Sequence, residues 1–211
     1  KTDFFLLISP DIKINENSIS KLLKTASSNN NCAIAAPLNV TDPDSYGILP
    51  EKRDLYEKNK NLININLDKL YTKPEGEICV DVTKGCVLFI NSKFFKEVNG
   101  FSEKYFLFWE EVDLCKKFLK KKLSIIVNPL SLAYHNEGTS SKIDLENIFI
   151  RSFHHEISPL YYFNVKKSSL YLYKNIIKYF FRTISYFLIF NFKRSFKNFS
   201  KLSANIIFIL K

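Results

Sequence analysis

Short apolar runs alternate with segments of helical periodicity over the first two thirds of the chain, and this alternation restricts the fold more than any other feature. The apolar runs cover residues 3–8, 32–38, 85–90, 124–127 and 132–135. The segments of helical spacing between them cover residues 18–28, 92–98 and 110–122. Because strands that alternate with helices build layered sheets, the pattern predicts an α/β domain with a mixed, mostly parallel sheet.

The charge distribution divides the chain into two parts. The net charge is +10, and residues 157–211 contain ten Lys and Arg residues but no Asp or Glu. The whole excess of positive charge therefore belongs to the C-terminal part, where the pattern is helical from residue 145 onward. We predict a domain over residues 1–144 and a basic, amphipathic helical extension over residues 145–211.

The extension has the composition of a helix that binds a membrane surface. Apolar residues between Ile176 and Leu188 follow one helical face, with Lys174, Lys178 and Arg182 beside it. The longest uncharged stretch has ten residues, 183–192, whereas a spanning helix needs about 20. We therefore expect residues 157–211 to lie on an anionic membrane surface; the alternative is a basic helix packed on its own domain. No nucleic-acid recognition module is present, so no nucleic acid is expected as a partner.

The cysteine spacing indicates the redox compartment, and the first residue indicates whether the chain is a fragment. The four cysteines lack paired C-x-x-C spacing, which favours buried thiols in a reducing, cytoplasmic compartment over disulfides or a zinc site. The chain begins at Lys1 and contains no methionine. We therefore expect a fragment or a processed chain.

An aromatic and acidic segment, residues 100–115, is the strongest candidate for chemistry. Four aromatic residues, Tyr105, Phe106, Phe108 and Trp109, directly precede the carboxylates of Glu110, Glu111 and Asp113. Aromatic side chains exclude water from a neighbouring carboxylate and raise its pKa, which favours a general base. The alternative is an ordinary acidic helix start, which the helix dipole also favours.

Asp11 follows one apolar run and His135 ends another, and both lie at strand ends, where α/β sheets carry their sites. With them, four segments occur in the order typical of one enzyme family: residues 4–11, 85–90, 98–115 and 133–141. In these segments the chain resembles the inverting glycosyltransferases of family 2, especially the rhamnosyltransferase-like bacterial members. The resemblance implies a GT-A fold that lacks the first part of its nucleotide-binding half, and hence a chain that is inactive alone.

The resemblance also implies a reaction, in which a sugar, plausibly rhamnose, passes from a nucleotide-sugar donor to a lipid-linked or polysaccharide acceptor at the inner face of the cell membrane. Glu111 would be the catalytic base, Asp113 the next candidate, and Glu110 a residue that orients its neighbours or caps the helix. Asp11 and His135 would bind a divalent cation, Mg²⁺ or Mn²⁺. A turn-capping Asp and a structural His remain the alternatives.

The remaining implied contacts concern the substrates. Gly85 and Cys86 would border the donor sugar, where small residues permit close approach. The hydroxyls of Ser140 and Ser141 would reach phosphate oxygens. Phe108 and Trp109 would form the wall of the acceptor pocket, or alternatively belong to the core. A different class of function also fits the segregated charge, namely a non-catalytic peripheral membrane-binding module.

Overall fold

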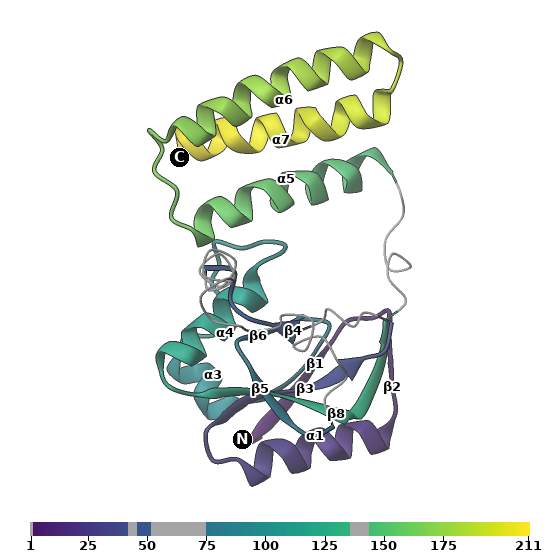
Figure 1. Cartoon of the computed structure of the whole chain (residues 1–211), viewed down its shortest axis with the longest axis vertical. Coiled ribbons are helices and arrows are strands. Elements are labelled where there is room, and N and C mark those ends of the chain that lie inside the picture. The colour runs from purple at the N-terminus through teal and green to yellow at the C-terminus, as the bar shows by residue number, and fades with distance from the viewer. Residues whose placement is uncertain (1, 42–45, 52–74, 136–143) are drawn as a thin grey trace, which may run out of the picture. The chain divides into compact units, whose positions relative to one another are not determined.

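The computed structural model describes residues 2–41, 46–51, 75–135 and 144–211 (Figure 1). The chain forms two compact units. The first comprises Lys1–Ser102 and Glu111–Ser140, and the second comprises Glu103–Glu110 and Ser141–Lys211. The short aromatic segment before Glu111 therefore belongs to the helical unit, although its sequence neighbours on both sides belong to the first unit.

The first unit is built on a mixed sheet. Its strands are β1 (Phe4–Ile8), β2 (Ile12–Ile14), β3 (Cys32–Asn39), β4 (Tyr46–Gly47), β5 (Ile78–Val80), β6 (Val82–Thr83), β7 (Val87–Asn91) and β8 (Ser124–His135). The order in the main sheet is β1-β7-β3-β8-β2, with β5 also paired to β8, and β4 pairs with β6 separately. The helices are α1 (Glu16–Ser28), α3 (Ser92–Glu97) and α4 (Glu110–Lys120).

The predicted α/β class with a mixed sheet and a helical C-terminal extension is confirmed, but parallel pairing is rarer than predicted. Among the described pairings β3 and β8 are parallel, and β1–β7, β3–β7, β2–β8 and β5–β8 are antiparallel. An apolar run indicates burial rather than strand direction, so the run at residues 3–8 does not reveal the antiparallel pairing of β1 with β7. Strand β1 is half-buried and lies at the edge of the sheet.

Two predicted strands, residues 124–127 and 132–135, form the single strand β8. Pro129 lies between them and, because proline lacks a ladder donor, favours a break at that point. The pairing of β3 with β8 continues past it through a register shift between Pro37 and Leu38. This continuity brings His135 into the same strand as the buried core residues.

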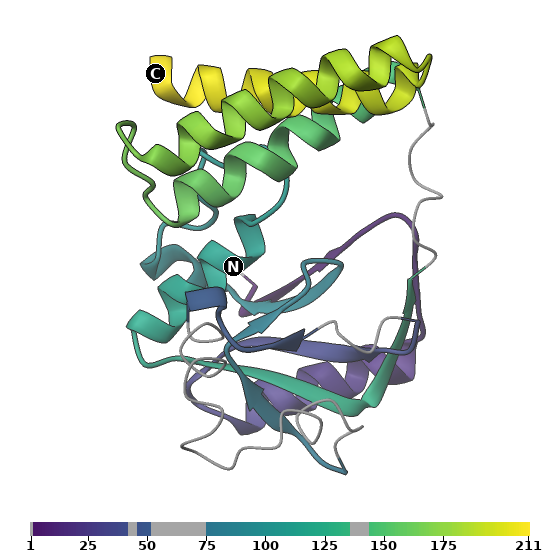
Figure 2. The ribbon, with the colours of Figure 1, turned by 45° about the horizontal axis from the view of Figure 1, so that its top comes forward.

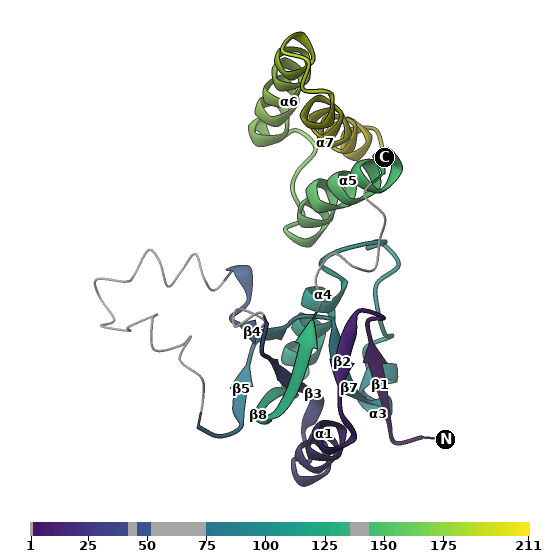
Figure 3. The ribbon, with the colours of Figure 1, turned by 90° about the vertical axis from the view of Figure 1, so that its right-hand side faces the viewer.

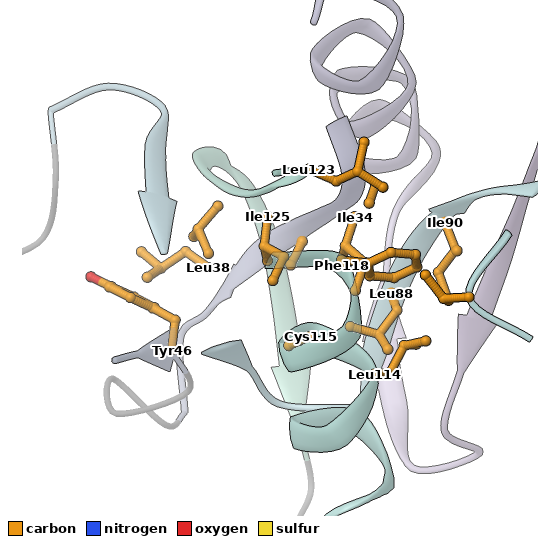
Figure 4. Packing of buried hydrophobic residues seen from close by; sticks show 14 residues of the cluster. Ile34, Leu38, Tyr46, Leu88, Ile90, Leu114, Cys115, Phe118, Leu123 and Ile125 are labelled. Carbon is orange, nitrogen blue, oxygen red and sulfur yellow. The ribbon is translucent and has the colours of Figure 1, made fainter. Parts of the chain in front are cut away.

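Helices cover both faces of the sheet (Figure 3). Successive side chains of β7 and β8 point to opposite faces: Leu88, Ile90, Ile125 and Val127 pack with α4, whereas Val87, Phe89 and Ile126 pack with α1. Figure 4 shows the first of these layers, in which Phe118 of α4 lies against the sheet. Strand β3 lies between both layers and is buried at all eight positions.

Local capping sets the limits of the helices. The Asn15 side chain accepts a hydrogen bond from the Ser18 N–H (2.8 Å) and so begins α1. After α3 the chain turns at Gly100, whose φ is +58° and whose N–H bonds the Phe95 carbonyl (2.9 Å). A Cβ at this glycine would lie 2.9 Å from the Phe95 ring, so the turn requires glycine.

The second unit contains three long helices, α5 (Leu145–Tyr162), α6 (Leu170–Leu188) and α7 (Phe192–Leu210). Helix α7 packs against both α5 and α6 (Figure 2). The second unit has an apolar core and, beside it, a polar cluster around Glu156. Glu156 accepts hydrogen bonds from the Tyr179 hydroxyl (2.8 Å) and the Asn205 amide (3.2 Å). Among the described residues, no helix combines the length and apolar character needed to cross a membrane.

The layer between α4 and the sheet should supply much of the stability of the first unit. Leu114→Ala removes a fully buried side chain, and we expect it to lower the free energy of unfolding by about 2–5 kcal/mol. Leu23→Ala on α1, where the leucine is 47% exposed, is the matched control and should change it by about 0.5 kcal/mol or less. Urea denaturation of both variants tests this, and equal losses would contradict the assigned packing.

Candidate active site

Asp11 and His135 meet at one edge of the sheet. In the antiparallel pairing of β2 with β8, Ile12 lies opposite His135, so the residue before Ile12 is brought beside the imidazole. Asp11 Oδ1 lies 3.4 Å from His135 Nε2, and the two side chains are only 8% and 17% exposed. Two residues separated by more than 120 positions therefore form a largely buried acid–imidazole pair.

The loop before β7 lies beside this pair. Strand β1 pairs with β7 so that Ile8 is opposite Val87, and the next N–H, that of Ser9, donates to the Cys86 carbonyl oxygen (2.9 Å). Burial raises the pKa of the Cys86 thiol, and the negative charge of Asp11 adds to this effect. Cys86 and Asp11 therefore interact electrostatically, and the thiol is neutral at physiological pH.

Gly85 connects this loop to Glu111. A Cβ at Gly85 would lie 3.3 Å from the Glu111 Cβ and 3.5 Å from its Cγ. The 3.3 Å spacing is tighter than an ordinary contact between carbon atoms. The absence of a side chain at Gly85 therefore allows α4 to approach the loop. A series of contacts thus runs from Glu111 through Gly85, Cys86 and Ser9 toward Asp11, all within the first unit.

Asp113 has structural partners. Its Oδ2 accepts a 2.6 Å hydrogen bond from the Ser102 hydroxyl and lies 3.5 Å from the Lys117 ammonium. That ammonium also donates to the Gly100 carbonyl oxygen (2.8 Å). The side chain is buried and ties the loop after Gly100 to the first turns of α4.

The chain enters α4 through a strained turn. Phe108 and Trp109 both have left-handed backbone angles, with φ of +65° and +72°. Two adjacent bulky residues in this region are unusual, and each costs about 1–3 kcal/mol. Glu110, which follows them, has a buried Oε2 atom with no hydrogen-bond partner among the described residues. Strain and an unsatisfied carboxylate oxygen directly before Glu111 are features that cluster at functional positions.

The aromatic rings of this turn pack within the helical unit. The Phe108 ring contacts His155 (5.6 Å between centroids) and lies under the Arg151 guanidinium (5.5 Å). The Trp109 ring contacts Tyr162 and Phe163 of the same unit, at 4.9 and 5.5 Å. These contacts correspond to the alternative of a core role, and the predicted role as an acceptor wall stays a prediction.

Two residues near His135 were missed from the sequence. The Thr41 hydroxyl accepts a hydrogen bond from the His135 N–H (3.0 Å) and lies 2.9 Å from its carbonyl oxygen. Asn39 is buried and accepts a hydrogen bond from the Thr41 hydroxyl, and its amide nitrogen has no hydrogen-bond partner within the part of the chain that the structure describes. It lines a cavity of about 10 Å³ together with Cys86 and Thr83. A polar residue at the end of a fully buried strand was the available signal.

The donor atoms at Asp11 and His135 fit part of a divalent-cation site. One carboxylate oxygen and one imidazole nitrogen already face each other, and both are ligands that Mn²⁺ accepts. Within the described part of the chain, no group of three or more His, Cys, Asp or Glu residues could hold a metal. Substrate oxygens and water would be among the remaining ligands of such a site. Ser140 and Ser141 lie outside the described residues.

One family model matches part of the chain. Residues 71–137 match the family model described as the N-terminal domain of galactosyltransferase. This stretch includes Gly85, Cys86, Glu111, Asp113 and His135, and supports a glycosyltransferase-like domain. It does not distinguish family 2 or a sugar, so those predictions stay predictions. No curated protein matches the sequence.

Among solved structures, the chain matches the crystal structure of GalNAc-T7 with UDP, GalNAc and Mn²⁺ at a TM-score of 0.46 and 12% sequence identity. The match covers 74% of this chain and 34% of GalNAc-T7. The chain thus spans about a third of the length of that protein.

The environment of Cys86 can be tested by alkylation with iodoacetamide. Because burial and Asp11 raise its pKa, its thiolate is scarce below pH 9, and its reaction rate should increase about tenfold per pH unit between pH 7 and 9. Cys79 is exposed and should react first. Cys115, whose pKa is raised to about 12, should remain unmodified. Mass spectrometry of wild type and Cys86→Ser identifies each site; Cys86 reacting as fast as Cys79 would contradict this environment.

Proposed function

We propose that this chain forms part of an inverting glycosyltransferase of the GT-A type, with Glu111 as the base and Asp11 and His135 as cation ligands. The observation that carries the proposal is the largely buried Asp11–His135 pair, with 3.4 Å between Oδ1 and Nε2. It is supported by the contact of Glu111 with Gly85 in the same unit and by the family match over residues 71–137.

The proposed chemistry is a direct displacement. The Glu111 carboxylate takes the proton of an acceptor hydroxyl as that oxygen forms a bond to the anomeric carbon of the donor sugar. The bond between the anomeric carbon and the phosphate oxygen breaks, and the nucleoside diphosphate leaves with the electron pair. Attack from the face opposite the leaving group inverts the anomeric carbon.

A cation held by Asp11 and His135 would supply positive charge to the departing diphosphate. The protein's contribution is to keep the imidazole and the carboxylate in one place, which the β2–β8 register and the Thr41 hydrogen bonds to the His135 backbone achieve. The neutral thiol of Cys86 would present a small, uncharged surface beside the donor sugar.

Finer features of the proposal derive from the family resemblance. We propose a family 2 enzyme that transfers a hexose-type sugar, such as rhamnose, from a nucleotide-sugar donor. Its acceptor would be a lipid-linked or growing surface polysaccharide. Support comes from the four ordered segments between residues 4 and 141.

Glu111→Gln in the full-length protein tests the base. The substitution preserves size but removes proton affinity, so we expect the rate of sugar transfer to fall by about 10²–10⁴-fold while donor binding is unchanged. Glu103→Gln, at an exposed position seven residues before α4, is the matched control and should keep full activity. Transfer that survives Glu111→Gln, with the product unchanged in stereochemistry, would remove Glu111 from the mechanism.

The cation site can be tested without an activity assay, by electron paramagnetic resonance of Mn²⁺. Asp11→Asn and His135→Gln should each weaken Mn²⁺ binding by about tenfold or more, since each removes one of two protein ligands. Asp3→Asn, at an exposed position, is the control. A nucleoside diphosphate should tighten binding by supplying oxygen ligands. No Mn²⁺ affinity, with or without the diphosphate, would instead favour the non-catalytic module.

A further inference from the structure

Helix α6 presents a long apolar stripe to solvent. Eight large apolar side chains, each more than a third exposed, follow one another at helical spacing: Leu170, Tyr173, Ile177, Phe180, Phe181, Ile184, Phe187 and Leu188. Steps of three, four and seven residues place them on one face of the helix. A continuous exposed apolar face of this length is uncommon on a protein that remains in water and indicates a binding surface.

The stripe is not the face with which α6 packs in its own unit. That face carries Leu172, Asn175 and Tyr179, which are buried. The Tyr179 hydroxyl is held by Glu156 of α5 at 2.8 Å, and Glu156 also bonds Asn205 of α7. Because these buried polar groups need each other as partners, rotating α6 to hide its stripe would leave them unsatisfied.

Figure 1 shows the turn that joins α6 to α7. Exposed apolar residues of this turn extend the stripe. Phe190 is 80% exposed, and its φ of +56° directs the chain from one helix into the next. The Phe192 ring lies 5.6 Å from that of Phe187 and 6.2 Å from that of Phe190. The three rings form a compact aromatic cluster at the end of the hairpin.

The charge beside the stripe has one sign. Lys174, Lys178 and Arg182 recur every four residues and so form an exposed row along α6. Residues 157–211 contain ten basic side chains and no acidic one. A second copy of this chain would bring a like-charged surface against the stripe, which is unfavourable. A surface that is both apolar and negatively charged satisfies both features.

We propose that the α6 stripe and the Phe187–Phe190–Phe192 cluster dock on the surface of an anionic lipid bilayer. The aromatic rings enter the boundary between headgroups and acyl chains, and the basic row contacts the lipid headgroups. This inference concerns the second unit alone and does not depend on the proposed transfer reaction.

Sedimentation with vesicles tests the proposal on the full chain. We expect binding to vesicles of 30% phosphatidylglycerol in phosphatidylcholine, weaker binding to pure phosphatidylcholine, and loss of binding as salt rises from about 0.05 to 0.5 M. Phe190→Ser should lower the partition coefficient about tenfold. Phe106→Ser, at a position 75% exposed outside the stripe, is the matched control and should leave it unchanged.

A second pair of variants tests the contribution of the basic row to vesicle binding. Lys174→Gln should lower the partition coefficient about fivefold, whereas Lys24→Gln, exposed on α1, should have no effect. Circular dichroism verifies that each variant is folded. Absence of binding to the anionic vesicles, or equal losses for Phe190→Ser and Phe106→Ser, would overturn the proposal. A dimer seen by light scattering that dissociates on Phe190→Ser, without vesicle binding, would assign the surface to a second copy.

Discussion

The packing of strand β3 constrains the rest of the first unit. All eight of its residues are buried, and it pairs with β7 on one side and β8 on the other. Such a strand is stable only when both faces of the sheet are covered, which α1 and α4 do. Most positions of the central strands therefore carry apolar side chains, and Asn39, Asp11 and His135 lie at the end of a strand or in a turn.

The register of the outer strands then determines which of these polar residues meet. Pairing of Ile12 with His135 brings Asp11 to the imidazole, and pairing of Ile8 with Val87 brings Ser9 to Cys86. A slip of one residue would turn every side chain of β2 to the opposite face and separate the pair. The candidate site is therefore a consequence of strand pairing rather than of local sequence.

The two units differ in the apolar surface that they leave exposed. The sheet unit buries its apolar surface, whereas the helical unit leaves a stripe of α6 exposed beside a row of positive charge. Glu110 and Glu111 are adjacent in the chain but belong to different units. Phe108 and Trp109, which precede this boundary, both have left-handed backbone angles.

The sequence by itself determined the helices and the central strands. Periodicity and capping are local, so α1, α4 and α5 begin within two residues of the predicted positions. It also identified Asp11 and His135 as strand-end residues, and the exposed face of α6 as an apolar stripe. Direction of pairing could not be predicted, because an apolar run such as β1 has the same pattern in either orientation. The continuity of β8 past Pro129 was missed for a similar reason, since the register shift that accommodates it lies in the pairing with β3.

Only the tertiary structure decided which residues meet. In the structure Thr41 bonds to the His135 backbone, and Gly85 contacts Glu111. Asp113 interacts with Ser102 and Lys117. The rings of Phe108 and Trp109 pack against residues of α5. These contacts join residues far apart in the chain, and they depend on strand register and helix packing, which are set by the burial of many side chains at once. A local pattern can identify candidate catalytic residues, but the free energy that brings them together comes from the packing of the whole fold.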